Sequence, residues 1–456
     1  QSVEAGLNVR CTFRSPESYV LPLRELIQEG GLSMETIDNR VRDILRVKFL
    51  TGLFDTPYQT DLALADKEVN SEAHQQVALQ ASREGLVLLK NANNLLPLDK
   101  SQIKRIAVCG PNADEASFAL THYGPVAVEV TTVLEGIKQQ VKEGTKVTYT
   151  KGCDLVDTNW PESEIISYPL TAEEKTEIQK AVDNVKESDV AVVVLGGGIR
   201  TCGENKSRTS LDLPGHQQQL LEAIVATGKP VVLVLINGRP LSINWADKFV
   251  PAILEAWYPG SQGGTAIAEA LFGDYNPGGK LTVTFPKTVG QIPFNFPAKP
   301  ASQVDGGQTP GMKGNQSRIN GPLYPFGYGL SYTTFEYSNL QLSSPVITDK
   351  EPVTVTCKIK NTGTRSGDEV VQLYTRDVVS SVTTYEKNLR GFERVRLEPG
   401  ETKEVSFQLL PRDFQLLNKD NHWVVEPGMF QIMIGASSED IRLKKGLEIR
   451  AYGQAS

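Results

Sequence analysis

The pattern of apolar and polar positions divides the chain into segments of different character. In the first segment, residues 1–58, a short loop is followed by apolar residues that recur at helical spacing, at Ile37, Val41, Ile44, Leu45 and Phe49. Ser33 can cap this helix, and Gly52 and Pro57 stop it. One amphipathic helix cannot bury its apolar stripe alone. We therefore expect this segment to be the tail of a larger upstream domain.

The second segment, residues 59–300, alternates between strand and helix patterns. The predicted strands cover residues 106–109, 147–149, 190–195, 231–236, 252–257 and 280–285. The predicted helices cover residues 71–84, 133–141, 172–185, 214–226 and 263–272. Several strands are apolar on both faces, as in the centre of a largely parallel sheet. This alternation predicts a layered α/β domain with ligand sites at the carboxyl ends of its strands.

The last part of the chain changes to the two-residue period of strands. Residues 301–340 belong to a stretch rich in Pro, Gly, Asn and Ser, which predicts a loop and linker. From residue 341 to 456, apolar residues alternate with polar ones, and turn signals such as Glu398-Pro399-Gly400 separate the runs. About seven short strands in such a length are typical of a β-sandwich of the immunoglobulin or fibronectin type III kind.

Composition and charge exclude several classes of function. The chain has 456 residues, enough for two or three domains, and its net charge of -7 is spread without a long basic run. Nucleic acid is therefore not an expected partner. The longest apolar runs have the length of buried strands, so no membrane span is predicted. The first residues lack an initiator Met and a signal sequence, and we expect a fragment or a processed product.

The five cysteines give no metal-binding pattern. They are sparse, odd in number, and form no C-x-x-C pair or Cys/His cluster with ligand spacing, so no metal is expected. Buried free thiols are the default expectation. If one disulfide forms, Cys153 and Cys202 are the candidate pair, because each follows a strand-like segment.

The chemistry-bearing candidate is the long polar loop that follows the strand at 190–195. Three glycines, Gly196 to Gly198, open it, but a dinucleotide-binding fingerprint needs a sixth-position glycine, where Thr201 stands. The loop also carries Glu204, and hydrolysis of a glycosidic bond needs a carboxylic acid to protonate the leaving oxygen. Spacing alone favours a simpler interpretation, a surface carboxylate in a solvated cluster with Lys206 and Arg208.

The motif Gly203-Glu204-x-x-Ser207-Arg208, followed by Leu213-Pro214-x-x-Gln217, resembles the acid/base loop of glycoside hydrolase family 3 β-glycosidases. Other stretches are similar to the family in the family's order, at residues 37–45, 52–55, 82–91, 110–114, 257–264, 277–286 and 324–335. The resemblance thus covers essentially the whole chain. It implies the tail of a (β/α)8-like barrel, an α/β sandwich domain that carries the acid/base, and a fibronectin type III-like domain.

The resemblance also implies a reaction and a missing partner. The family hydrolyses terminal β-linked sugars with retention and without a metal or organic cofactor, and Glu204 takes the place of the acid/base. The family's nucleophile is an Asp shortly before an Ala-Gly-x-Asp segment, which is matched here by Ala5-Gly6-Leu7-Asn8. The nucleophile is therefore expected upstream of Gln1, on the N-terminal barrel portion of the same protein, with none in this chain. Asn8 departs from the family's Asp.

Three further residues receive roles from the resemblance. The family's aglycone-side aromatic loop corresponds to residues 120–125, where Tyr123 either stacks on a sugar face or anchors the loop. His122 is a weaker substrate-binding candidate. Arg208 is expected to support the Glu204 loop, for instance by pairing with a carboxylate.

The sequence leaves the sugar and the assembly open. A β-glucosidase is the first expectation, a β-xylosidase is the alternative within the family, and a non-catalytic carbohydrate-binding fragment is the alternative outside catalysis. The expected ligand is an oligosaccharide or β-glycoside, and a homodimer is possible. The family leads us to expect a periplasmic or secreted location.

Overall fold

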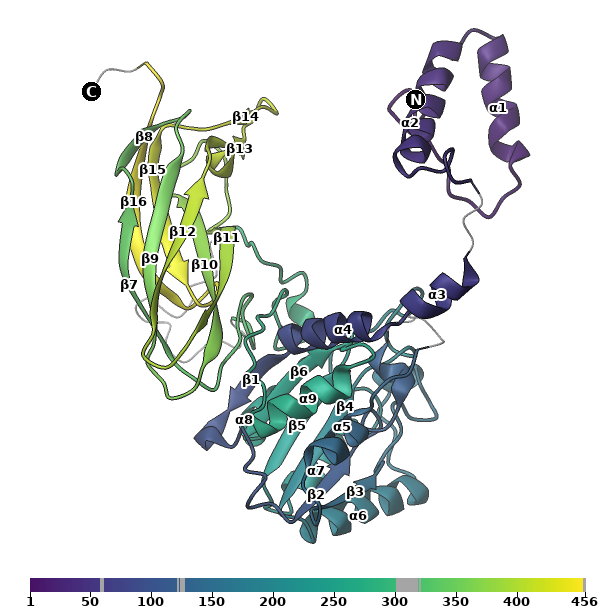
Figure 1. Cartoon of the computed structure of the whole chain (residues 1–456), viewed down its shortest axis with the longest axis vertical. Coiled ribbons are helices and arrows are strands. Elements are labelled where there is room, and N and C mark those ends of the chain that lie inside the picture. Colours follow the sequence, from purple (N-terminus) through teal and green to yellow (C-terminus); the bar gives the residue numbers. More distant parts are fainter. Residues whose placement is uncertain (58–60, 121–122, 124–127, 301–318, 320, 454–456) are drawn as a thin grey trace. The chain divides into compact units, whose positions relative to one another are not determined.

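The computed structural model describes residues 1–57, 61–120, 123, 128–300, 319 and 321–453, without the side chains of residues 118 and 119 (Figure 1). The chain divides into two compact units, Gln1–Ser71 and Glu72–Ser456. Of the predicted loop and linker at 301–340, residues 301–318 and 320 lie outside the described residues.

Among its described residues, the first unit contains three helices. They are α1 (Glu17–Gln28), α2 (Met34–Leu50) and α3 (Leu62–Glu68). The predicted cap of α2 is confirmed, because the Ser33 side chain accepts a hydrogen bond from the Thr36 backbone N–H, and Gly52 follows the helix with φ +71°. None of these three helices has a buried residue, and Phe49 on the apolar face of α2 is 63% exposed.

Helix α1 was not expected, since a loop was predicted before Ser33. Pro22 lies inside α1, and no side chain caps its start at Pro16. Proline inside a helix and the lack of a capping residue both weaken the sequence signal for a helix. Sequence signals based on capping residues and helix breakers therefore do not predict this helix.

The second unit begins with a six-stranded sheet. Its strands, in spatial order, are β1 (Val87–Asn91), β6 (Ala252–Trp257), β5 (Val231–Ile236), β4 (Val190–Gly196), β2 (Arg105–Cys109) and β3 (Lys146–Thr150). All neighbouring pairs are parallel except β1 with β6. The expected largely parallel sheet is confirmed, and the carboxyl ends of β2, β4, β5 and β6 share one edge.

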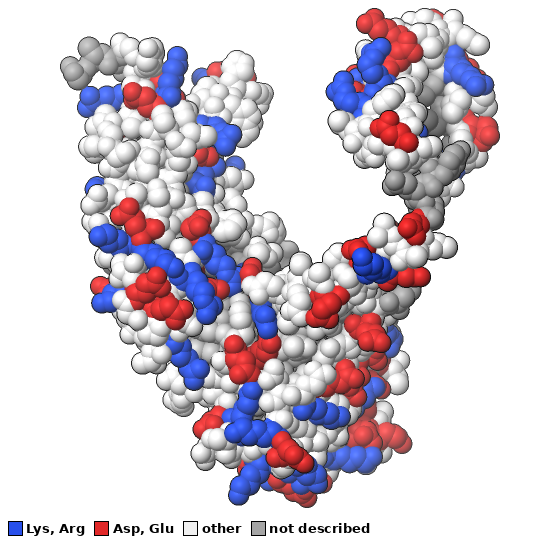
Figure 2. Space-filling model, viewed as in Figure 1, with Lys and Arg blue, Asp and Glu red and all other residues white. Residues whose placement is uncertain are grey.

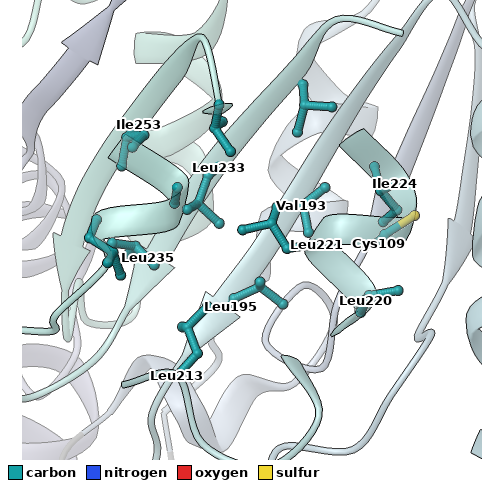
Figure 3. Packing of buried hydrophobic residues seen from close by; sticks show 14 of the residues in the cluster. Cys109, Val193, Leu195, Leu213, Leu220, Leu221, Ile224, Leu233, Leu235 and Ile253 are labelled. Carbon is teal, nitrogen blue, oxygen red and sulfur yellow. The ribbon is translucent and has the colours of Figure 1, made fainter. Parts of the chain in front are cut away.

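Helices cover both faces of this sheet. They are α4 (Glu72–Gly85), α5 (Val133–Gln140), α6 (Ala172–Lys186), α7 (Gln217–Val225), α8 (Asn244–Phe249) and α9 (Gly263–Phe272). Buried residues of α6, α7 and α8 form one core with one face of the sheet, and those of α4, α5 and α9 form a second core with the other face. In Figure 3, Leu220, Leu221 and Ile224 of α7 lie over Val193 and Leu195 of β4.

The prediction of a strand at residues 280–285 is wrong, because this segment forms no strand. Phe285 forms only an isolated bridge with Tyr324, in which the Phe285 N–H donates to the Tyr324 carbonyl at 2.9 Å. Leu281 and Phe285 are nevertheless buried in the core. Their burial explains the strand-like apolar pattern, although the segment joins no sheet.

The C-terminal part of the second unit is the predicted β-sandwich. Its strands are β7 (Phe335–Leu342), β8 (Val346–Thr348), β9 (Val353–Asn361), β10 (Gly367–Asp377), β11 (Asn388–Leu397), β12 (Thr402–Leu409), β13 (Leu416–Leu417), β14 (Trp423–Val424), β15 (Gly428–Gly435) and β16 (Ile441–Arg450). One sheet has the order β11-β10-β15-β16-β8 and the other β12-β9-β7. The alternating apolar residues of β9, β10 and β15 form the core between the two sheets.

All five cysteines are free thiols. Cys109, Cys153 and Cys357 are buried, and the candidate pair of Cys153 and Cys202 forms no disulfide. Among the described residues, no cluster of three or more His, Cys, Asp and Glu side chains is placed to hold a metal ion, and no helix is long and apolar enough to cross a membrane. Figure 2 shows acidic and basic side chains interspersed over the α/β domain on the face in view.

Candidate active site

The candidate loop, residues 197–216, joins the carboxyl end of β4 to the start of α7. Gly196, the last residue of β4, has φ +132°, and a Cβ at this position would lie 2.1 Å from the Ile236 carbonyl oxygen. A Cβ on Gly197 would lie 2.6 Å from the Thr201 hydroxyl. These two glycines are therefore required by the close approach of the loop to β5 and to its own next turn.

Two buried amides fix the start of the loop. The Gln217 side chain accepts from the Gly196 N–H at 2.8 Å and donates to the Gly196 and Leu155 carbonyls at 2.9 and 2.8 Å. The Asn112 side chain donates to the Gly197 carbonyl at 2.8 Å. Both side chains are buried, so these bonds form in a low-dielectric interior and hold the end of β4 in one conformation.

Glu204 lies at the exposed tip of this loop. The residues on both sides of it have positive φ, +138° at Gly203 and +61° at Asn205. The Tyr123 hydroxyl donates to the Glu204 carboxylate at 2.5 Å, across 81 positions of sequence. The loop after β2 and the loop after β4 therefore meet at this carboxylate.

Tyr123 is itself exposed, at 71% of its surface. The hydrogen bond to Glu204 raises the pKa of the Tyr123 phenol above its ordinary value, because the nearby carboxylate favours the protonated donor. The phenol is thus protonated at neutral pH and can donate to Glu204. His122 lies outside the described residues.

Arg208 occupies a buried position at the base of the loop. Its guanidinium pairs with Glu164, and the two side chains are only 4% and 5% exposed. Arg208 also donates to the Asp212 carbonyl at 3.0 Å and lies over the Trp160 ring at 5.0 Å. The second Glu164 oxygen accepts from the Thr209 N–H at 2.9 Å. Glu164 was missed by the sequence analysis because its segment carries no periodic or motif signal.

A polar cleft of about 360 Å³ opens at the same edge of the sheet. It is lined by Pro111, Glu115, Lys151, Asp154, Leu155, Val156, Asp157, Thr158 and Arg200. The lining comes from the loops after β2, β3 and β4, and Arg200 is four positions from Glu204. Such a lining of charged and hydroxyl groups suits a ligand with many hydroxyl groups.

The comparisons with known proteins place the fold in a family. Residues 86–332, more than half of the chain, match the glycosyl hydrolase family 3 C-terminal domain, and residues 369–438 match a fibronectin type III-like domain. The chain therefore belongs to glycosyl hydrolase family 3, as the sequence motifs indicated. Its α/β domain is the C-terminal domain of that family, and a fibronectin type III-like β-sandwich follows it.

The relatives are β-glycosidases. A β-xylosidase of Formosa agariphila is 43% identical over 92% of this chain and 56% of its own length, and a periplasmic β-glucosidase of Salmonella typhimurium is 39% identical over 98% and 59%. The crystal structure of a β-glucosidase from Listeria innocua in complex with isofagomine superposes with a TM-score of 0.85, at 33% identity over 99% of this chain and 60% of that one. The chain thus spans a little over half the length of these relatives.

Proposed function

We propose that this chain supplies the general acid/base, Glu204, to a β-glycosidase that releases terminal sugars with retention of configuration. The observation that carries the proposal is the position of Glu204, exposed at a strand-end loop and hydrogen-bonded to Tyr123, inside the family-matched domain. Strand-end loops are where α/β domains place reactive groups. The relatives, whose names describe β-glucosidases and β-xylosidases, support the reaction class.

In the proposed mechanism Glu204 acts twice. It first protonates the glycosidic oxygen as the aglycone leaves, while a carboxylate nucleophile forms a covalent bond to the sugar. It then takes a proton from the water that hydrolyses this intermediate. The nucleophile is proposed to be an Asp on a barrel domain encoded upstream of Gln1, in line with the family motif matched by residues 5–8.

The residues around Glu204 receive supporting roles. Tyr123 donates to the Glu204 carboxylate, and its ring is proposed to contact the sugar on the aglycone side. His122, its neighbour in sequence, is proposed as a weaker contact. Arg208, paired with Glu164, is proposed to hold the distal half of the loop in shape.

The proposed substrate is a terminal β-D-glucosyl residue, with a β-xyloside as the alternative. The relatives include enzymes named for both sugars, so the names do not choose between them. The part that distinguishes a C6 hydroxymethyl group is proposed to belong to the barrel. A periplasmic or secreted location is proposed with the Salmonella relative as its support.

The experiment that tests the proposal is the Glu204→Ala substitution in the polypeptide extended upstream through the barrel. General acid/base help is worth about 10²–10⁴ in rate, roughly 3–5 kcal/mol, and this loss is expected on alkyl β-glucosides. Aryl glucosides with good leaving groups need less protonation and should lose less in the first step. Azide should partly restore turnover, because it attacks the intermediate without a general base.

A matched control is Glu187→Ala. Glu187 is an exposed carboxylate at the amino end of β4, opposite the candidate edge, where it pairs with Arg105 at 2.7 Å. The Glu187→Ala variant should hydrolyse the alkyl and the aryl glucoside at rates close to those of the unmodified protein. Equal losses on alkyl and aryl substrates in Glu204→Ala, with no azide rescue, would remove Glu204 from the role.

A further inference from the structure

A second loop approaches the candidate acid/base from the neighbouring strand. The segment Asn237-Gly238-Arg239-Pro240 follows β5 directly, and β5 pairs with β4 along its whole length. The Arg239 guanidinium, through Nη2, donates to the carbonyl of Thr201 and to the carbonyl of Lys206, each at 3.0 Å. One side chain therefore bridges two points of the Glu204 loop.

The two bonded carbonyls lie on either side of Glu204. Between them, Gly203 and Asn205 adopt positive φ, and the main chain makes a single turn in which the Lys206 N–H donates to the Gly203 carbonyl at 3.1 Å. Such a short irregular segment at the surface has few bonds of its own to fix its tip. A guanidinium that ties both ends together reduces the number of positions open to the carboxylate.

The segment that carries Arg239 is anchored by buried side chains. The Asn237 side chain donates to the Arg239 carbonyl at 2.8 Å, and the Asn237 N–H donates to the Trp257 carbonyl at 3.1 Å. The Glu255 carboxyl accepts from the Trp257 N–H at 2.8 Å. Asn237 and Glu255 are 1% and 0% exposed, so the carboxyl ends of β5 and β6 form a buried base for Arg239.

We propose that Arg239 is a positioning residue for the glycosidase reaction, which holds Glu204 where it can protonate the leaving oxygen. The inference rests on the proposed function of Glu204. It assigns Arg239 no contact with substrate: the guanidinium acts through main-chain carbonyls of the loop. A displacement of the carboxyl group by about 1 Å is enough to cost on the order of 10²-fold in rate.

The first test is kinetic and uses the polypeptide extended through the barrel. Arg239→Ala is expected to lower kcat/KM for an alkyl β-glucoside by about 10- to 100-fold, and for a 2,4-dinitrophenyl glucoside by less than about threefold. Arg239→Lys keeps the charge but not the planar arrangement of donors. Its kcat/KM for the alkyl β-glucoside should therefore lie between that of Arg239→Ala and that of the unmodified protein. Equal losses on both substrates would overturn the positioning role.

A matched control separates this role from general loss of stability. Arg442 in the sandwich also donates to a main-chain carbonyl, that of Phe335 at 3.0 Å, and pairs with Asp440 at 2.7 Å. Arg442→Ala should change the rates on the two substrates by the same factor. A leaving-group dependence in Arg442→Ala equal to that in Arg239→Ala would count against the inference.

The second test needs no turnover and uses the 456-residue chain. Hydrogen exchange of the amides in residues 201–207 should become faster in Arg239→Ala, while amides of β4 and β5 stay protected. Unchanged exchange in the loop would overturn the inference. If Glu204→Ala loses the same factor in rate on alkyl and aryl glucosides, the proposed function of Glu204 fails. The exchange measurement then still decides whether Arg239 holds the loop.

Discussion

At the scale of single residues, the hydrogen bond from Tyr123 to Glu204 joins two loops that the sequence keeps far apart. Both side chains are exposed, so neither is positioned by burial. A hydrogen bond to an ionised acceptor is stronger than one between neutral groups, and at 2.5 Å this one is short. It should therefore be visible in the titration of the Tyr123 phenol, whose pKa it raises.

The Tyr123 phenol provides a direct readout of this contact. Its pKa is raised chiefly by the hydrogen bond to Glu204 and also by the charge of that carboxylate. Glu204→Gln removes the negative charge, so the phenol loses its preference for the protonated form, and its pKa should fall towards the ordinary value near 10. NMR of ¹³Cζ-labelled tyrosine, assigned with Tyr123→Phe, measures the shift in the 456-residue chain.

A second tyrosine, which is partly exposed, supplies the control. Tyr168 donates to Glu162 at 2.9 Å, and this bond raises its pKa in the same direction. Its pKa should be the same in Glu204→Gln as in the unmodified chain. A Tyr123 pKa that does not move in Glu204→Gln would show that the two side chains are apart in solution.

Residue motifs predicted the place of the candidate acid/base but not its neighbours. Glu204 stands in a linear motif, which a sequence displays directly. Glu164 and Arg239 act on the loop through contacts across 44 and 33 or more positions, which no local pattern encodes. The signal that was available for Arg239 was its place directly after a buried strand next to β4, because carboxyl ends of parallel strands meet at one edge.

At the scale of elements, the edge formed by β4, β5 and β6 contains a buried carboxylic acid. Glu255 on β6 is 0% exposed, and burial raises its pKa well above the ordinary value of 4.5. Between pH 4.5 and the raised pKa, Glu255 is therefore protonated in the folded chain and ionised in the unfolded chain. Stability linked to this proton is fully present below pH 4.5 and is lost as pH rises towards the raised pKa.

Replacing Glu255 by Gln tests this linkage. The amide keeps an acceptor for the Trp257 N–H but does not titrate. The free energy of unfolding of the unmodified chain, relative to Glu255→Gln, should fall as pH rises above 4.5, with a slope of at most about 1.4 kcal/mol per pH unit. Urea unfolding from pH 4.5 to 7.5 measures it, and parallel pH profiles for the two proteins would contradict a protonated Glu255.

Periodic elements were predicted well where the pattern is continuous and buried. The bounds of β5, β6 and α9 are those expected, because their apolar runs end at clear polar or glycine signals. The strand prediction for residues 280–285 was wrong because residues buried against the core gave this segment the apolar pattern of a strand. Helix α7 begins at Gln217, three positions after the predicted start at Pro214. Leu213 is drawn into the core, and the loop ends in a turn at Gly215 with φ +58°.

At the scale of the whole molecule, the second unit is held together by polar contacts between its α/β domain and its sandwich. Lys280 pairs with Glu369 at 3.0 Å, and both side chains are nearly buried. Arg394 of β11, which pairs with Asp368 inside the sandwich at 2.7 Å, donates to the Tyr275 hydroxyl of the α/β domain at 2.8 Å and pairs with Glu84 of α4 at 3.5 Å. Contacts of this kind couple the two folds into the single compact unit 72–456.

The first unit, residues 1–71, exposes apolar side chains on its helices. Its helices bury no residue of their own, and apolar side chains such as Val41 and Phe49 are exposed. We propose that this unit completes a barrel, as the expected domain boundary near residue 58 implies. The family match begins only at residue 86 and therefore leaves that boundary a prediction.

The central claim is that this chain holds the acid/base of a glycosidase whose nucleophile lies on the barrel portion. The most direct measurement compares initial rates of the purified 456-residue chain and of the polypeptide extended upstream through the barrel, on 4-nitrophenyl β-glucoside and β-xyloside. We expect turnover by the extended polypeptide only, with the glucoside as the better substrate. Turnover by the pure 456-residue chain alone would place a nucleophile within it and contradict the assignment.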